Sequence, residues 1–256
     1  MAKIEHKDLL DAGVHFGHLT RKWDPKMAPF IFMEKNGIHI IDLYKTLNCL
    51  EEASNAIKQI VKSGRKVMFV ATKKQAREVV TAEAQKHRMP YVTDRWLGGM
   101  LTNFATIRKS LKKLSTMDKM LKEDSYKNLA KREKLMISRE KIKLERVLGG
   151  VADLTRLPAA LFVVDIKREH IAIKEAHKLN IPVFAMVDTN SDPNQVDFPI
   201  PSNDDAFKSI SLIVTHISKA IEEGLNERKK EKDDAKQKEE VEAKKQADEK
   251  AEAAAE

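Results

Sequence analysis

Continuous apolar runs alternate along this chain with segments whose apolar residues recur every three or four positions. A continuous apolar run is typical of a strand buried on both faces of a sheet, and the three-to-four spacing is typical of an amphipathic helix. The runs predict strands at 37–43, 66–72, 90–92, 158–165 and 182–188. The amphipathic segments predict helices at about 4–14, from a Thr46 cap to Gly64, through 76–84, and at about 171–179 and 204–223. Strands that alternate with helices predict an α/β domain with a parallel sheet and helices on both faces.

One stretch, residues 104–149, departs from this alternation. Its first apolar stripe consists of Ile107, Leu111, Leu114 and Leu121. Its second apolar set consists of Leu129, Leu135, Met136, Ile142 and Val147, and the polar segment 122–125 between the two is a plausible turn. Two helices of roughly 20 residues each would form a finger about 30 Å long. We therefore predict an antiparallel coiled-coil hairpin inserted into a doubly wound domain.

The insertion divides the chain into three parts. Residues 1–103 and 150–225 would form a discontinuous α/β domain, and 104–149 the inserted basic hairpin. Residues 226–256 consist largely of Lys, Glu, Asp, Gln and Ala, which is typical of a low-complexity tail that is disordered or loosely helical.

Charge is distributed unevenly over these parts. The span 108–146 holds 14 Lys or Arg against 6 Asp or Glu, a net charge of +8 that equals the formal charge of the whole chain. Residues 222–256 hold 13 acids against 9 bases, so residues 1–221 carry +12. A body this basic favours a polyanionic partner, most simply nucleic acid.

The segment 13–27 shows neither helix nor strand periodicity and mixes Gly, His, Trp and basic residues, so we expect an ordered loop. Such a loop can stack aromatic rings on bases and pair its Lys and Arg side chains with phosphates. The alternative is a loop that packs Phe16 and Trp23 into the core, and the sequence does not decide between the two.

Motifs for cofactor chemistry are missing from the sequence. The turn after the strand at 66–72 reads Thr-Lys-Lys-Gln and lacks the glycines of a dinucleotide or triphosphate loop. Gly98-Gly99 precedes a helix and could present amides to a phosphate, although a flexible junction explains it as well. The single Cys49 excludes an intramolecular disulfide framework and is expected in the core. With no apolar signal core or membrane-length run, we expect a soluble cytoplasmic protein.

Two groups of residues were considered for catalysis or metal binding. Asp165 and Asp188 each end a predicted strand, where a capping role is more common than catalysis. His15, His18 and His39 lack a cysteine or a matching carboxylate pattern, so we expect no metal site and no cofactor.

Three hypotheses follow from the residues alone. The first is a structural RNA-binding protein, because a net +8 over about 40 residues is self-repulsive unless a polyanion relieves it. The second is a nucleotide-using α/β enzyme with Asp165 and Asp188 at its site. The third is a coiled-coil adaptor that docks protein partners.

Six motifs carry a resemblance to a known family. They are AGVHFGH at 12–18 with TRKWDPKM at 20–27, NGIHIIDL at 36–43, RWLGGMLTN at 95–103, LPAA at 157–160 leading into Val163-Val164-Asp165, NIPV at 180–183, and DTNSDP at 188–193. In this order they resemble the bacterial small-subunit ribosomal protein S-two family over about residues 5–224. Asp24 stands where that family often has Asn.

The resemblance implies a flavodoxin-like α/β domain with an inserted coiled-coil hairpin and no catalysis. It also implies binding of small-subunit ribosomal RNA near the head–body junction, a role in docking the large neighbouring protein S-one, a ribosomal location, and no membrane or small-molecule partner. The implied RNA contacts are His15, His18, Arg21, Lys22, Trp23 and Lys26 in the loop, Arg95, Trp96 and Asn103 at the neck of the finger, and Arg108, Lys109, Lys112 and Lys113 on its first helix.

Overall fold

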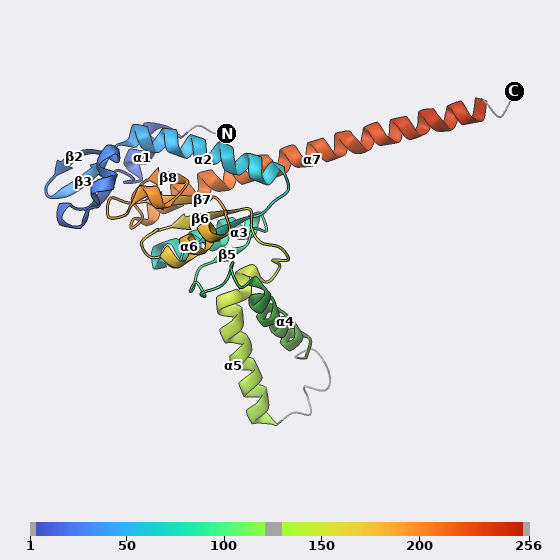
Figure 1. Cartoon of the computed structure of the whole chain (residues 1–256), viewed down its shortest axis with the longest axis horizontal. Coiled ribbons are helices and arrows are strands. Elements are labelled where there is room, and N and C mark those ends of the chain that lie inside the picture. The colour runs from blue at the N-terminus through green and yellow to red at the C-terminus, as the bar shows by residue number, and fades with distance from the viewer. Residues whose placement is uncertain (1–3, 121–129, 253–256) are drawn as a thin grey trace.

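The computed structural model describes residues 4–120 and 130–252, and for residue 232 and residues 234–252 it describes the backbone alone. Its central element is a parallel sheet with the strand order β5-β4-β6-β7-β8 (Figure 1). The strands are β4 (Val67–Val70), β5 (Tyr91–Val92), β6 (Ala160–Val164), β7 (Val183–Val187) and β8 (Phe198–Pro201). Numbered along the chain, this order is 2-1-3-4-5, which is the flavodoxin-like arrangement. The predicted α/β fold with a parallel sheet is therefore confirmed.

Helices cover both faces of the sheet, because each strand buries side chains on both sides. In β4, Val67 and Phe69 pack into one core while Met68 and Val70 pack into the other. The first core is closed by α2 (Leu43–Lys62), α3 (Lys74–Lys86) and α7 (Phe207–Glu252). The second is closed by α6 (His170–Lys178) and by the base of the hairpin. Figure 1 shows α2 and α7 above the sheet, with α6 and the hairpin below it.

One predicted strand needs correction, and one strand of the parallel sheet was not predicted. The run 37–43 does not join the parallel sheet: β3 (Ile38–Ile41) lies between β1 (Phe16–Leu19) and β2 (Ile31–Lys35) in a separate antiparallel sheet. Burial alternates along β3, as expected for a sheet with one solvated face, whereas every residue of β4 is buried. The fifth parallel strand is β8 instead. It lies at the edge of the sheet, and its Pro199 and Pro201 kept the sequence pattern from predicting a strand there.

Several boundaries also differ from the prediction. The first helix, α1, covers only His6–Asp11. Helix α2 is capped by Asp42, whose side chain accepts from the Tyr44 amide at 3.0 Å, whereas Thr46 lies inside the helix. The segment 13–27 is not simply a loop, because it contains β1 and two 3-10 turns, η1 (Thr20–Lys22) and η2 (Pro25–Phe30). Two further 3-10 turns are η4 (Gly149–Val151) and η5 (Pro193–Gln195).

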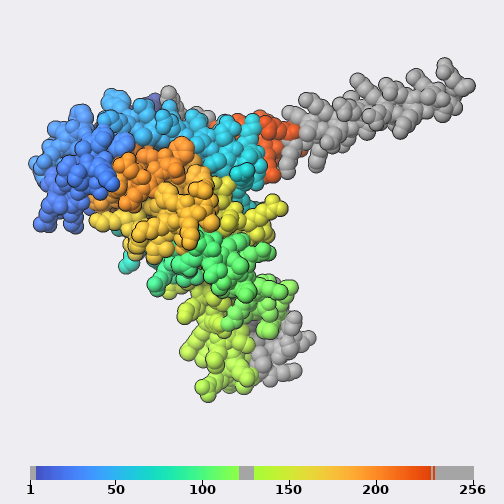
Figure 2. Space-filling model, viewed as in Figure 1, coloured from blue at the N-terminus to red at the C-terminus, as the bar shows by residue number. Residues whose placement is uncertain are grey.

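The hairpin consists of α4 (Phe104–Met120) and α5 (Lys131–Leu148), which project from the body between β5 and β6 (Figures 1 and 2). Helix α4 buries Ile107, Leu111, Leu114 and Met117. On α5, by contrast, Leu135, Met136 and Ile142 are exposed, and the contact with the body is made near Leu148. The predicted turn at 122–125, Leu121 and Leu129 lie outside the described residues. The coiled-coil character of the hairpin and the division into domains stay predictions.

Helix α7 is longer than the sequence suggested. It continues through Glu252 instead of ending near residue 223, so most of the predicted tail has helical backbone (Figure 1). Among the helices described, none is long and apolar enough to cross a membrane.

Candidate nucleic-acid interface

The basic N-terminal segment is held against the loop that follows β7. The His18 amide donates to Thr189 Oγ1 at 2.8 Å, and the Asp24 amide donates to the Thr189 carbonyl at 2.8 Å. A Cβ at Gly17 would lie 2.6 Å from Thr189 Cγ2, so this close approach requires glycine. The segment is therefore fixed to the carboxyl edge of the parallel sheet by residues about 170 positions away.

Once fixed, this segment presents cations and a ring to solvent. Arg21, Lys22 and Lys26 are exposed, and Trp23 is 38% exposed with its ring 5.0 Å from that of His39. The residue that enters the core is Met27, so the alternative in which Phe16 and Trp23 form the core contact is wrong. The backbone around Trp23 and Lys26 is fixed by a cap: the Asp24 side chain accepts from the Lys26 amide at 2.9 Å at the start of η2.

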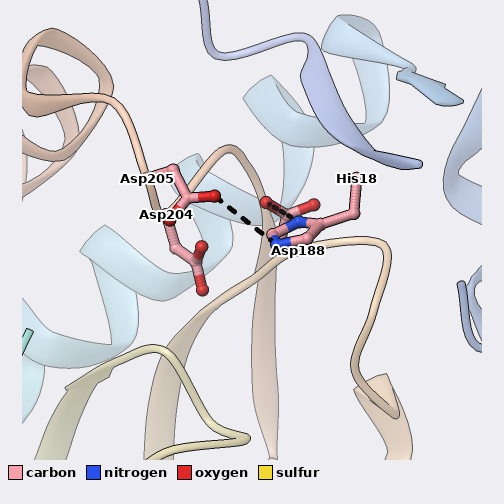
Figure 3. A group of neighbouring side chains, drawn as sticks. All are labelled: His18, Asp188, Asp204 and Asp205. Atoms are coloured by element: carbon pink, nitrogen blue, oxygen red, sulfur yellow. Dashed lines mark ion pairs between the residues drawn. The ribbon is translucent and has the colours of Figure 1, made fainter. Parts of the chain in front are cut away.

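The two histidines of this segment have different surroundings. His15 is partly buried with its ring 4.1 Å from that of Phe16; burial, and secondarily His6, lower the pKa of His15. His18 Nδ1 lies 2.9 Å from Asp188 Oδ2, and His18 Nε2 lies 3.4 Å from Asp205 Oδ2 (Figure 3). The contact with Asp188 raises the pKa of His18, although burial acts in the opposite direction.

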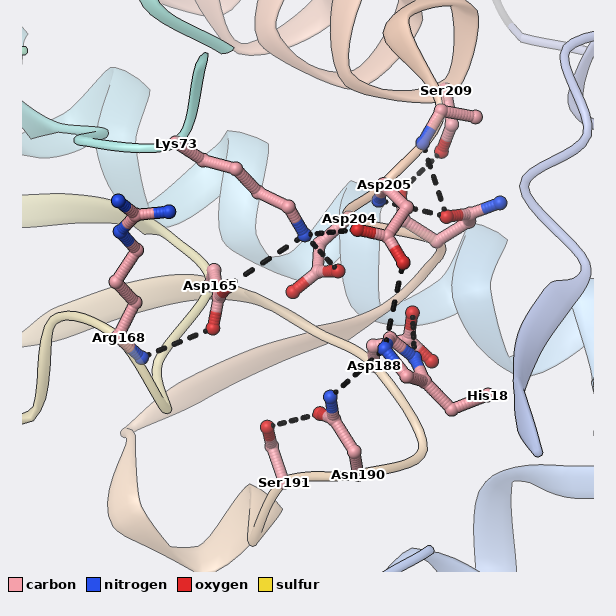
Figure 4. A network of polar contacts seen from close by, with 12 residues as sticks. His18, Lys73, Asp165, Arg168, Asp188, Asn190, Ser191, Asp204, Asp205 and Ser209 are labelled. Atoms are coloured by element: carbon pink, nitrogen blue, oxygen red, sulfur yellow. Dashed lines mark hydrogen bonds and ion pairs between the residues drawn. The ribbon is translucent and has the colours of Figure 1, made fainter. Parts of the chain in front are cut away.

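The carboxyl edge of the sheet holds a dense group of charges (Figure 4). Lys73, which follows β4, places its Nζ 2.7 Å from Asp204 Oδ1 and 2.6 Å from Asp205 Oδ1, and 3.6 Å from Asp165 Oδ2. Burial raises the pKa of Asp204 to about 7, and the neighbouring carboxylates of Asp188 and Asp165 add to that shift. The place where a sheet of this type usually binds a ligand is thus occupied by side chains of the chain itself.

Of the two strand-end aspartates, Asp165 caps the turn that follows its strand, whereas Asp188 contacts the adjacent residue Thr189, which is not a capping contact. Asp165 Oδ1 accepts from the Arg168 amide at 3.1 Å, and Asp188 Oδ1 accepts from the Thr189 amide at 2.5 Å. Asp165 has a φ of 68°, a left-handed conformation that Asp tolerates better than most residues. The sequence reasoning missed Asp204 and Asp205, because they follow the strand that it also missed.

At the neck of the hairpin, several hydrogen-bond donors converge on one carboxylate. Glu175 on α6 accepts from the indole of Trp96 at 3.1 Å and from the Gly99 amide at 2.7 Å. Its other oxygen accepts from the Leu101 amide at 3.0 Å and from the Thr102 amide at 3.1 Å. Burial acts to raise the pKa of Glu175, but these hydrogen bonds lower it overall.

This arrangement changes the role of one predicted contact. Trp96 is only 6% exposed and points its N–H at Glu175, so it supports the neck from inside. Arg95 and Asn103 are exposed beside it, and Asn103 accepts from the Thr106 hydroxyl at 2.9 Å in the first turn of α4. Sequence reasoning could not identify Glu175, which is an ordinary acid on an amphipathic helix.

A second ionic group ties the hairpin to the body. Asp94 Oδ1 lies 2.9 Å from Arg146 on α5 and 3.4 Å from Arg77 on α3. Between the two hairpin helices, Lys141 pairs with Asp118 at 2.7 Å and Lys113 pairs with Glu140. Asp94 therefore ties the base of the hairpin to the body, and the two pairs between α4 and α5 hold the helices to each other.

The cations on the outer face of α4 are left unpaired. Arg108, Lys109 and Lys112 are exposed, and none forms an ion pair with the part of the chain that the structure describes. Residues three and four apart share one face of a helix, so the three charges form one patch, opposite the buried stripe of Ile107 and Leu111. Of the predicted hairpin contacts, Lys113 has an ion-pair partner, Glu140, within the described part of the hairpin.

These features define a class: an α/β protein whose own side chains fill the ligand edge of the sheet and which displays a basic surface on a projecting arm. Residues 9–224 match the family model of ribosomal protein S2. The chain therefore belongs to the ribosomal protein S2 family, as the motifs implied.

Individual relatives agree with the family model. The chain is 74% identical over 234 residues to small ribosomal subunit protein uS2 of Cytophaga hutchinsonii, covering 91% of this chain and 92% of the relative. It is 63% identical to the protein of that name from Flavobacterium johnsoniae, covering 90% and 91%, and 60% identical to that from Parabacteroides distasonis, covering 92% and 84%.

Family membership settles the general role. The chain is a ribosomal protein of the small subunit and belongs to no enzyme family, so the hypothesis of a nucleotide-using enzyme is wrong. Its location is the ribosome, and its partners are ribosomal RNA and other ribosomal proteins.

Proposed function

We propose that the protein binds small-subunit ribosomal RNA at the head–body junction through two basic surfaces on one rigid frame. The first is the N-terminal segment with Arg21, Lys22 and Lys26, and the second is the outer face of α4. The observation that carries the proposal is the unpaired patch of Arg108, Lys109 and Lys112, because exposed cations without internal partners are available to phosphates.

The proposed RNA contacts are of two kinds, with phosphates and with bases. Lys and Arg side chains bind phosphates and set affinity and salt dependence without reading sequence. Trp23 offers a ring face on which a base can stack. The proposed set is His15, His18, Arg21, Lys22, Trp23, Lys26, Arg95, Asn103, Arg108, Lys109, Lys112 and Lys113, with Trp96 left out because it is buried.

Reconstitution tests this proposal. Small subunits depleted of this protein are incubated with the full-length chain over a salt series, and RNA protection is mapped by hydroxyl-radical footprinting. We expect protection confined to the RNA at the head–body junction and a steep fall in affinity as salt rises. Protection elsewhere, or affinity insensitive to salt, would contradict the proposal. Association that survives nuclease digestion of the RNA would instead favour the adaptor hypothesis.

A second proposed role is the docking of protein S-one, and one surface favours it. An apolar groove of about 470 Å³ lies between α1, the antiparallel sheet and the start of α2. Phe32 and Tyr44 line it and are each 70% exposed. We test the groove with Phe32→Asp, which should prevent purified S-one from joining reconstituted subunits. The control is Leu135→Asp on α5, another apolar residue in solvent, 50% exposed, that should leave S-one binding intact.

A further inference from the structure

Four residues with metal-binding side chains meet at the carboxyl edge of the sheet, although they come from three distant parts of the chain. They are His18 from β1, Asp188 after β7, and Asp204 and Asp205 after β8. One nitrogen or oxygen from each lies within 4.8 Å of the others (Figure 3). Four atoms bound tetrahedrally to one zinc ion at 2.0–2.2 Å lie roughly 3.3–3.6 Å apart, so closing around an ion requires side-chain shifts of up to about 1 Å.

The carboxylates share a pattern in which Lys73 or Thr189 holds one oxygen and the other oxygen faces into the cluster. Asp204 Oδ1 is paired with Lys73, and Asp188 Oδ1 accepts from the amide and hydroxyl of Thr189. Asp204 Oδ2 is buried and has no hydrogen-bond partner among the residues described, and Asp188 Oδ2 is buried with His18 Nδ1 at 2.9 Å. Both side chains are 1% exposed. Asp205 follows the same pattern, with Oδ1 on Lys73 and Oδ2 facing His18.

Unpaired buried carboxylate oxygens are costly unless a cation or proton meets them. The donors on the Oδ1 atoms resemble the outer hydrogen bonds that orient metal ligands in known sites. Local charge points the same way: four carboxylates, Asp165, Asp188, Asp204 and Asp205, face one ammonium, Lys73 (Figure 4). In the deprotonated state that metal binding requires, with His18 neutral and all four carboxylates ionised, the group carries a net charge of −3, and a divalent cation would reduce it to −1.

We propose that His18, Asp188, Asp204 and Asp205 bind one divalent transition-metal ion, with Zn²⁺ the best fit. An imidazole nitrogen favours Zn²⁺ over Mg²⁺ or Ca²⁺, which prefer sets made only of oxygen. The ion would fasten β1 to the loops after β7 and β8, and so fix the adjoining residues Arg21 and Lys22. The site is structural, since its ligands hold three separate segments of the chain together.

Calorimetry on the metal-free, full-length protein tests the site, with ZnCl₂ and MgCl₂ as titrants. We expect one equivalent of Zn²⁺ with a Kd below about 1 μM, at least ~100-fold tighter than Mg²⁺. Asp204→Asn keeps an oxygen for Lys73 but removes the ligand charge, and should weaken Zn²⁺ binding by at least ~100-fold. The matched control is Asp192→Asn, a carboxylate in the same loop region that pairs with Lys26 and lies outside the cluster. Its Kd should equal that of the wild type.

A second measurement on the wild-type protein keeps the test decisive if Asp204→Asn fails to fold. With one equivalent of Zn²⁺, the imidazole NMR signals of His18 should shift while those of the exposed His170 and His177 stay unchanged. The proposal is overturned if Zn²⁺ binds no tighter than Mg²⁺, if Asp204→Asn binds Zn²⁺ like the wild type, or if the shifts appear at His170 or His177 instead.

Discussion

The carboxyl edge of the sheet and the outer face of α4 are both rich in charged side chains, yet the surroundings of these side chains are opposite. At the sheet edge, Lys73 lies among buried carboxylates and almost every polar atom contacts another part of the chain. On α4, Arg108, Lys109 and Lys112 lie in solvent and form no ion pair with residues 4–120 or 130–231. Charge at the edge therefore holds the fold together, whereas charge on α4 is left for an external partner.

The comparison also explains why a ligand-binding type of fold serves a structural protein. The strand order is that of nucleotide-binding domains, but the edge where their ligands bind is filled by His18 and Lys73 from the chain itself. The binding surface has moved to elements added to the sheet: the N-terminal segment and the hairpin.

The largest effect is expected from reversing the α4 patch with Arg108→Glu, Lys109→Glu and Lys112→Glu together. Loss of three phosphate contacts should weaken subunit binding on the order of 10³-fold near 0.15 M salt and flatten the slope of log K against log salt by about 3. Filter binding across a salt series measures both, and the melting temperature should not change. A triple reversal at the exposed Lys7, Lys74 and Lys178 alters net charge equally and should have a much smaller effect. Equal losses in the two triple variants would show that net charge, not the patch, determines binding.

The next largest effect is expected at the neck of the hairpin. Glu175→Gln should destabilise the protein by about 3 kcal/mol. The reason is that an amide N–H₂ group would then face backbone N–H donors that now share a carboxylate. For a chain of this size we expect the melting temperature to fall by roughly 10 °C and the amides of Gly99 and Leu101 to exchange faster. Glu78→Gln, on the exposed face of α3, is the control and should change the melting temperature little. An unchanged exchange rate at Gly99 would contradict the proposed role of Glu175.

A smaller, pH-dependent effect follows from the same residue. Hydrogen bonds outweigh burial and hold the pKa of Glu175 below its ordinary value of 4.5. The stabilising contribution of its ionised form is therefore fully present above pH 4.5 and is lost as the pH falls through the lower, folded-state pKa. The difference in melting temperature between wild type and Glu175→Gln should be constant from pH 6 to 8 and shrink below about pH 4. A difference that grows on acidification would exclude this explanation.

The smallest effect on stability is expected from Lys26→Ala, which removes the exposed ion pair with Asp192. Exposed pairs contribute little, so the melting temperature should stay within about 1 °C of the wild type. If Lys26 also contacts a phosphate, the salt slope of subunit binding should fall by about 1. Asp192→Asn removes the same pair but no cation, and should leave that slope unchanged. A clear loss of stability in Lys26→Ala would instead mean that Lys26 stabilises the fold, as the buried charges at the sheet edge do.

The sequence was sufficient for the parts of the fold that local pattern determines. The fully apolar β4, β6 and β7 and the alternating helices were predictable, because burial on both faces leaves an unbroken apolar run. Strand β8 was not, since Pro199 and Pro201 contradict strand propensity and are tolerated only at an edge. The misplaced β3 shows that an apolar strand does not reveal which sheet it joins.

The candidate interface was predictable to a similar degree. Exposed cations such as Arg108 could be identified from helical spacing, and the ring and bases of the N-terminal segment from composition. What could not be predicted depends on contacts between distant residues: Trp96 is inside because Glu175 on α6 receives its N–H, and His18 gains three carboxylate neighbours from after β7 and β8. No local pattern encodes a pairing across 171 positions.

That separation also sets an order of events during synthesis. The N-terminal segment leaves the ribosome first, but Thr189, which receives the amide of His18, is made 171 residues later. Contacts between such distant residues form late, because closing a long loop is entropically costly and its far end must first exist. The segment carrying Arg21 and Lys22 can therefore reach its final position only when the chain is nearly complete, so a nascent or truncated chain would lack this half of the basic surface.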